Sequence, residues 1–133
     1  MLEFYEQLPD YMSSDDLEIL FNNFLCFVDL NEHDLEEALE SLWELADRQW
    51  HTFKLLKSDI KIKVEDWLIS TIDFNSVEII GWIIGIIGHL GLERAFDILC
   101  KALKGDLTDE VRNRIEGAIN EYGENVQNPF SGM

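Results

Sequence analysis

The chain has 133 residues, of which 47% are hydrophobic and 11% aromatic, enough for one domain with its own buried core and too apolar for a disordered chain. Its 27 acidic and 10 basic residues give a formal net charge of −17. That charge argues against nucleic acid or an anionic membrane surface as a direct ligand, because clustered Lys and Arg bind both. It favours a basic protein partner.

The acidic residues are concentrated in the N-terminal third. Residues 1–47 contain 14 Asp or Glu and no Lys or Arg, whereas residues 48–133 contain 13 acidic residues and all 10 basic ones. This asymmetry has two interpretations. It is either a charged surface that keeps the protein soluble or a surface that attracts a cationic protein.

The N-terminal sequence MLEFYEQLPDYM contains acidic rather than basic residues and lacks the long apolar core of a signal peptide. The two cysteines, Cys26 and Cys100, lie in apolar stretches. Two isolated buried thiols are typical of a reducing compartment, with a disulfide as the alternative. We therefore predict a cytoplasmic protein.

Two amphipathic helices are expected in the first half of the chain. Residues 13–16 form a helix start, followed by an apolar stripe at helical spacing: Leu17, Leu20, Phe21, Phe24 and Val28. Asn31 or Asp34 is the expected cap of the next helix. Its stripe is expected to continue past a break near residue 48: Leu35, Ala38, Leu39, Leu42, Trp43, Ala46, Trp50, Phe53 and Leu56.

The most apolar stretch is SVEIIGWIIGIIGHLG, residues 76–91. It lies in a run of 14 residues without a formal charge, from Ile79 to Leu92. A membrane span needs about 20 apolar residues and is usually flanked by basic ones. Here Glu78 and Glu93 flank the run on its two sides. The stretch is therefore predicted to be a buried helix and not a membrane span.

This stretch is echoed 32 residues later by TDEVRNRIEGAINEYG, residues 108–123. Each copy begins with a hydroxyl residue that can cap a helix, Ser76 or Thr108, and ends with a glycine. The preceding segments VEDWLISTI and AFDILCKAL also align. Each unit is thus helix–turn–helix, and such units bury their apolar faces by stacking on one another.

We therefore predict an all-α fold, a right-handed stack of helical hairpins of the HEAT or armadillo type with six or seven helices. A single domain is expected over residues 1–123, with hairpins at about 60–91 and 92–123. Residues 124–133 are expected to form a flexible C-terminal tail.

Gly81, Gly85 and Gly88 lie on one stripe of the apolar helix. Each glycine costs helix propensity, up to about 1 kcal/mol relative to alanine, so a close contact is expected in return. A neighbouring helix of the same chain is the favoured explanation. A groove for a partner's side chain is the alternative.

An acidic stripe is expected on the second of the N-terminal helices, where four carboxylates fall within about 80° of the helix circumference. Its members are Glu37, Glu40, Glu44 and Asp47. Glu40 and Glu44 repel each other at i, i+4 spacing, and the first 47 residues contain no Lys or Arg to offset them. The stripe is either a solvated face or a docking surface for a cationic protein. Asp15 and Asp16 are further candidates for partner contacts.

Signals for catalysis, cofactors or metals are weak. Residues 29–40 resemble a calcium loop, but Asp34 occupies the position that requires glycine. His33, His51 and His89 are scattered without a zinc-binding spacing, and no nucleophile or phosphate-loop motif is present. Glu65 and Asp66 are adjacent on a helix and are expected to point in different directions. We therefore predict a protein that is not an enzyme, with no catalytic, cofactor or metal site.

The segment ERAFDILCKALKGDLTDE followed by VRNRIEGAINEYG resembles a HEAT-type repeat, including the Val111–Arg112 pair and Gly123. The upstream copy departs from that pattern, with Ile80 in place of the arginine. With WHTFKLLKSDIKIKVEDWLIS added, residues 50–123 also resemble the small helical immunity proteins of bacterial polymorphic-toxin systems, including those of contact-dependent growth inhibition.

The resemblance implies an immunity protein that is monomeric before binding and neutralises a cognate cationic toxin domain, such as a nuclease, by covering its active or substrate-binding surface. The expected contacts with that partner are Glu37, Glu40, Glu44 and Asp47, then Asp15 and Asp16. The alternative is a HEAT-like adaptor or scaffold with an unrelated protein partner.

Overall fold

The computed structural model describes residues 1–130. These residues form seven α-helices and one 3-10 turn, with no strand among them. The elements are α1 Leu2–Glu6, α2 Ser14–Leu30, α3 Leu35–Trp50, α4 Ser58–Ser70, α5 Val77–Leu90, α6 Glu93–Ala102, α7 Asp109–Tyr122 and η1 Gly123–Asn125.

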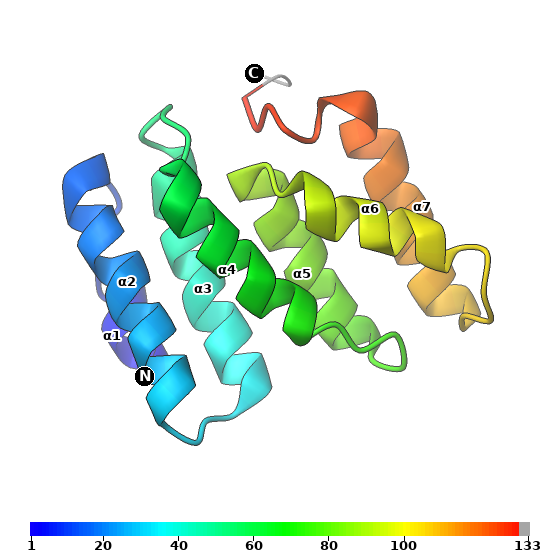
Figure 1. The fold of residues 1–133 in the computed structure, drawn as a ribbon, viewed down its shortest axis with the longest axis horizontal. Helices are drawn as coiled ribbons and strands as arrows, with labels where there is room; N and C mark the ends of the chain where they lie inside the picture. The colour runs from blue at the N-terminus through cyan, green and yellow to red at the C-terminus, as the bar shows by residue number, and fades with distance from the viewer. Residues whose placement is uncertain (131–133) are drawn as a thin grey trace.

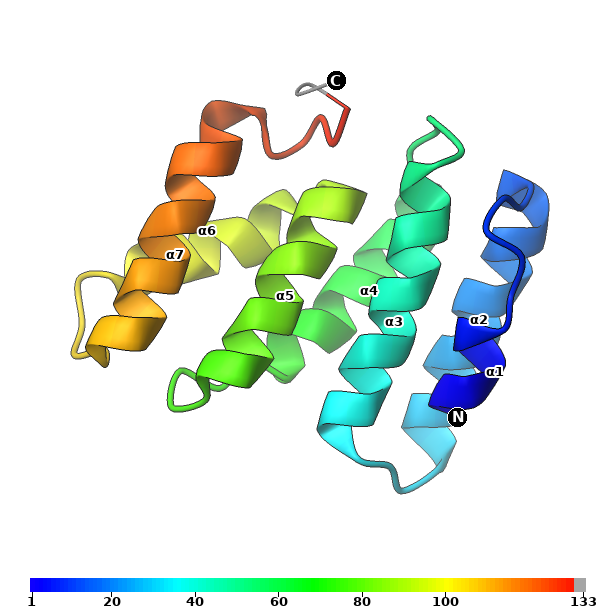
Figure 2. The same ribbon diagram turned by 180° about the vertical axis from the view of Figure 1, so that it is seen from behind.

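The helices are arranged in two layers (Figures 1 and 2). One layer contains α2, α4 and α6, and the other contains α1, α3, α5 and α7. Three hairpins, α2–α3, α4–α5 and α6–α7, follow one another along the long axis, and α1 packs against α3. The predicted all-α stack of helical hairpins is therefore confirmed, while its right-handedness stays a prediction.

Side-chain caps fix the start of four helices. The oxygen of each capping side chain accepts a hydrogen bond from the backbone N–H three residues later: Ser13 for α2, Asp34 for α3, Ser76 for α5 and Thr108 for α7. Ser76 and Thr108 occupy equivalent positions of the 32-residue echo, so the two copies begin in the same way. Of the two caps considered for α3, the fold uses Asp34.

The break expected near residue 48 corresponds to the end of α3 at Trp50, and the apolar stripe does not continue along a helix to Leu56. Its C-terminal turn is held by the buried amide of Gln49, which donates to the backbone oxygen of Lys54 at 2.8 Å. Phe53 adopts a left-handed conformation with φ of 58° and is 62% exposed. Leu56 still reaches the core, but from the loop before α4.

The apolar helix α5 lies between α3 and α7 in the second layer (Figure 2). Four of its six isoleucines are fully buried: Ile80, Ile83, Ile86 and Ile87. Across residues 1–130, the length and apolar character that crossing a membrane requires are not found together in any helix. The stretch from Val77 to Leu90 is thus an interior helix of the stack.

The glycines of α5 accommodate side chains from the two neighbouring helices. A Cβ at Gly85 would lie 3.3 Å from the indole of Trp43 on α3, and one at Gly88 would overlap the ring of Tyr122 on α7. The Tyr122 hydroxyl lies close enough to donate to the Ile84 carbonyl oxygen at 3.2 Å. Close approach of neighbouring helices is therefore confirmed, and aromatic side chains make that approach.

A buried carboxylate connects the second and third hairpins. Leu92, the residue before α6, has no side chain that can cap the helix. Glu65 of α4, only 4% exposed, takes that role by accepting from the backbone N–H of Ala95 at 3.0 Å. Glu65 and Asp66 both pair with Arg94, at 3.1 and 2.9 Å. Glu65 points inward and Asp66 is exposed, as expected of adjacent helical residues, but the long Arg94 side chain reaches both.

Chain packing continues beyond residue 123. Val126 is buried, and the indole N–H of Trp50 donates to the backbone oxygen of Pro129 at 2.8 Å. Part of the expected tail therefore lies against α3, although its flexibility stays a prediction. Residues 131–133 lie outside the described part of the chain.

Candidate partner-binding surface

The acidic stripe of α3 lies on the half-buried side of that helix. Three of its four carboxylates already have partners within the chain. Glu37 accepts from the backbone N–H of Leu2 at 3.1 Å and lies 3.4 Å from the N-terminal ammonium. These two donors lower the pKa of the Glu37 carboxyl. Much of the charge at this position is therefore used to fasten α1 onto α3.

Glu44 is paired with Arg48, whose guanidinium lies 2.6 Å from the carboxylate. Arg48 is only 4% exposed and also donates to the carbonyl oxygens of Leu8 and Pro9, at 2.8 and 2.9 Å. The expectation that no base offsets this part of the stripe is wrong. Arg48 stands one residue beyond the base-free segment and one helical turn after Glu44, a spacing that could have revealed the pair.

Asp47 lies between two histidines. One carboxylate oxygen is 3.6 Å from Nε2 of His89, and the other is 3.8 Å from Nδ1 of His51. Trp50 packs edge-on against both imidazoles, with ring centroids 5.3 and 5.7 Å apart. His51 and His89 are thus close in space although they are 38 positions apart, which corrects the description of the histidines as scattered.

Glu40 is the one member of the stripe without a basic partner in the described residues. Loss of hydration in its half-buried position raises the pKa of the Glu40 carboxyl, and repulsion from nearby acids raises it further. Those acids are Glu36, Glu6, Asp34 and Glu37. A charge at Glu40 is therefore disfavoured by the fold itself.

Asp15 and Asp16 do not belong to this stripe. Both are exposed in the first turn of α2, in the other layer. Negative charges are stabilised at that position by the dipole of the helix. Asp29 and Glu32 are likewise exposed at the far end of α2. Within residues 1–130 none of these four carboxylates forms an ion pair.

The structure also corrects the predicted burial of one cysteine and shows exposed apolar residues beside it that were not predicted as part of a binding surface. Cys26 is exposed and is not a buried thiol, whereas Cys100 is half-buried and burial raises its pKa. Cys26 lies on the outer face of α2 with two exposed apolar residues, Ile19 and Leu30. Their i, i+7, i+11 spacing opposite the core stripe was available in the sequence as a signal.

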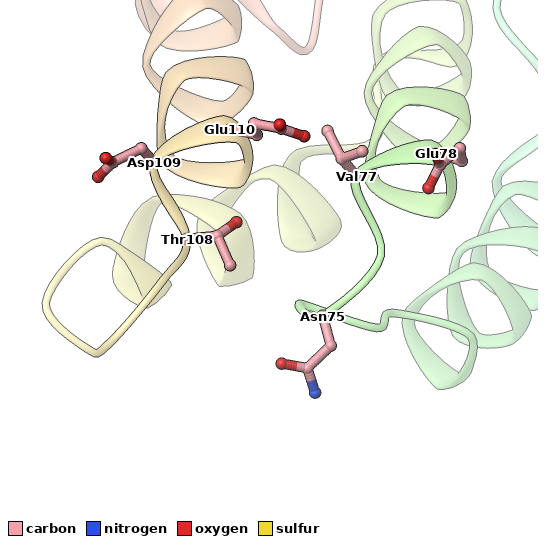
Figure 3. Close-up of a pocket in the computed structure, with 6 residues that line it drawn as sticks. All are labelled: Asn75, Val77, Glu78, Thr108, Asp109 and Glu110. Carbon is pink, nitrogen blue, oxygen red and sulfur yellow. The ribbon is translucent and has the colours of Figure 1, made fainter.

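A pocket of about 400 Å³ lies between the N-terminal ends of α5 and α7 (Figure 3). Figure 3 shows the side chains of Val77 and Glu110 directed toward each other across the gap and that of Asp109 directed away. The carboxylates here stand in the first turns of their helices, where the helix dipole stabilises them without any ligand. The acidic residues of the pocket are therefore explained by their positions at the helix N-termini.

The remaining chemistry-bearing residues are dispersed. Asp29 belongs to the last turn of α2 and Asp34 caps α3, so the segment resembling a calcium loop is a helix end followed by a short connection. No group of three metal-ligating side chains occurs in the part of the chain that the structure describes.

No family model, no curated protein and no solved structure matches the chain.

Proposed function

We propose that the chain is an immunity protein of a bacterial polymorphic-toxin system that binds and neutralises a cationic toxin domain in the cytoplasm. The observation that supports this most is the unbalanced charge of the α1–α3 end. Residues 1–47 of this end contain 14 acidic residues and no Lys or Arg. The neighbouring bases that reach them are Arg48, buried against Glu44, and Lys57, at 3.4 Å from Glu18.

Inhibition in this proposal is occlusion. A toxin that acts on RNA or DNA offers a basic surface to the phosphates, and an acidic protein covers that surface in their place. Long-range attraction speeds the encounter, while a few desolvated contacts set the lifetime of the complex. The protein needs no catalytic group for this role and acts as a monomer that forms a one-to-one complex.

The direct test is growth rescue. Where the native genome encodes a secreted protein with a basic C-terminal domain beside this chain, that domain is expressed in bacteria with and without the chain. We expect growth arrest by that domain alone, relief on co-expression and a one-to-one complex after purification. A folded chain that gives no relief contradicts the proposal. A stable complex with a harmless partner favours the adaptor alternative.

The electrostatic part has its own test, with matched variants. Replacing Asp15, Asp16, Asp29 and Glu32 by their amides removes four exposed charges from the α2 end. The control removes four exposed charges from the other end, at Asp106, Glu116, Glu121 and Glu124. With the basic domain, we expect the association rate at low salt to fall about tenfold in the first variant and much less in the control. Equal effects, or a rate that does not change with ionic strength, contradict steering by this end.

A further inference from the structure

The outer face of α2 combines exposed apolar side chains with unpaired acids. Ile19, Cys26 and Leu30 lie within about 40° of one another at 100° per residue, with Phe27 about 80° from Ile19. Ile19 is 60% exposed and Leu30 77%. The buried stripe of α2, containing Phe21 and Phe24, occupies the opposite side and packs toward α3 and α4. The exposed apolar residues thus take no part in the core.

The acids stand at both ends of this face. Asp15 and Asp16 precede Ile19 by about one turn, and Asp29 and Glu32 flank Leu30. The apolar stripe is about 17 Å long at 1.5 Å per residue. A standard interface covers about 800 Å² on each partner, with an apolar centre and a polar rim. The stripe therefore matches the centre of such an interface, and the acids match its rim.

The charge of the rim selects the kind of partner. A second copy docking face to face would oppose its own acids with no base among residues 1–47 to relieve them. A cationic surface would instead gain from every one of these carboxylates. The occupant that fits is a protein segment with apolar side chains flanked by Lys or Arg.

We propose that the outer face of α2, and not the acidic stripe of α3, is the surface that docks the cationic partner. Ile19 and Leu30 are its apolar anchors, and Asp15, Asp16, Asp29 and Glu32 form the charged rim. This inference rests on the proposed function for the existence of a basic partner. It adds the place of contact and the requirement that the partner present apolar as well as basic side chains.

The test uses a defined probe with the whole protein. The probe is an amphipathic helical peptide of about 18 residues built from Leu and Lys, longer than the minimum for a stable helix. A second peptide has every Leu replaced by Ser and keeps the charge. Binding is followed by chemical shifts of the ¹⁵N-labelled chain and by the alkylation rate of Cys26, with Cys100 as the internal reference.

We expect the Leu–Lys peptide to shift resonances along the outer side of α2 and to slow alkylation of Cys26 relative to Cys100. The double variant Ile19→Ser, Leu30→Ser should weaken binding about tenfold, since both anchors are lost. The variant Ile62→Ser is the matched control, because Ile62 is 54% exposed on α4, outside this face. It should bind as the parent does.

Three results would overturn the inference: shifts centred on the α3 stripe, equal affinity for the Leu and Ser peptides, or no binding at millimolar peptide. A concentration-dependent dimer that disappears in the Ile19→Ser, Leu30→Ser variant would also overturn it, because the occupant would then be a second copy. Growth rescue by the same double variant separates the two proposals. Full rescue together with any of these results would leave the immunity function in place and remove only the docking surface.

Discussion

The two ends of the helical stack differ in how they meet solvent. The last helix, α7, exposes polar residues on its outer side, among them Asn113, Glu116 and Asn120. At the other end, α2 exposes Ile19, Cys26 and Leu30. A terminal helix of a stack ordinarily needs a polar outer face, because no further unit covers it. Thus α7 has the polar outer face of a terminal repeat, whereas α2 does not, and this difference is the basis of the docking surface proposed for α2.

The two ends also use arginine differently, and the largest expected effect comes from that contrast. Arg48 is buried and holds Leu8 and Pro9 against α3. Arg112 of α7 donates to the carbonyl oxygens of Leu103 and Gly105 near the surface. Arg48→Ala should lower the free energy of unfolding by about 3 kcal/mol, because it leaves Glu44 and two carbonyl groups without a donor.

Arg112→Ala should lower the free energy of unfolding by only about 1 kcal/mol, since water can replace the hydrogen bonds of Arg112. Urea denaturation of both variants measures the difference. A smaller loss for Arg48→Ala than for Arg112→Ala would show that the N-terminal end is not held in the way described.

The next effect concerns glycines of the two echoed helices. Gly88 of α5 has no room for a Cβ beside Tyr122, whereas a Cβ at Gly117 of α7 would meet no atom within 4 Å. Gly88→Ala should destabilise the fold by about 2 kcal/mol, because the overlap outweighs the gain in helix propensity. Gly117→Ala should stabilise it by up to about 1 kcal/mol. Thermal unfolding of the pair gives the signs, and a stabilised Gly88→Ala protein would refute the packing of Tyr122 over α5.

The contact between α5 and α7 also predicts a dependence on alkaline pH. Burial raises the pKa of Tyr122 from its ordinary 10.0 to about 12. The fold favours the neutral phenol, so its contribution is complete below pH 10 and is lost as the pH rises from about 10 to about 12. Tyr122→Phe should therefore flatten the fall in stability over that interval. Parallel curves for the parent and Tyr122→Phe would contradict this assignment.

The smallest expected changes in stability come from two carboxylates of the α3 stripe, Glu40 and Glu37, and they have opposite signs. Glu40 has a raised pKa, so its ionised form opposes folding at neutral pH. Glu40→Gln should stabilise the protein by a few tenths of a kcal/mol at pH 7, the size of a like-charge pair on a helix. The gain should disappear below about pH 4.5, where the carboxyl is protonated in the unfolded chain as well.

Glu37→Gln should have the opposite sign, because its carboxyl has a lowered pKa. Its contribution is present above the unfolded value of 4.5 and is lost as the pH falls through the lower folded value. Chemical denaturation at pH 7 and at pH 4 measures both variants. Effects of the same sign at pH 7 would contradict the assigned partners.

The comparison of sequence and structure separates local from distant information. Helix starts were predictable because a cap and its backbone donor lie three residues apart, as at Ser76 and Thr108. The buried character of α5 followed from its apolar run and its echo. A break near residue 48 was expected, but the contact that holds the turn after Trp50 was not predictable. The buried amide of Gln49 donates to the backbone of Lys54, while the apolar pattern continues to Leu56.

Most of the features that could not be predicted from the sequence are contacts between residues far apart in the chain. Arg48 binds carbonyl groups 39 and 40 positions away, and Glu65 caps a helix 30 positions away. Only the folded stack brings these groups together. The preferred binding site moved from α3 to α2 for the same reason. The sequence places the acids of α3 on one helical stripe, but it does not show that three of them have partners within the chain, whereas Asp15 and Asp16 form no ion pair.

The central claim is that the α2 end of the stack meets the cationic partner. Hydrogen–deuterium exchange of the chain, free and in complex with a basic domain whose toxicity it relieves, tests this most directly. We expect slower exchange in residues 14–32 and unchanged exchange in α7. Protection of α7, or of α3 without α2, would contradict the account.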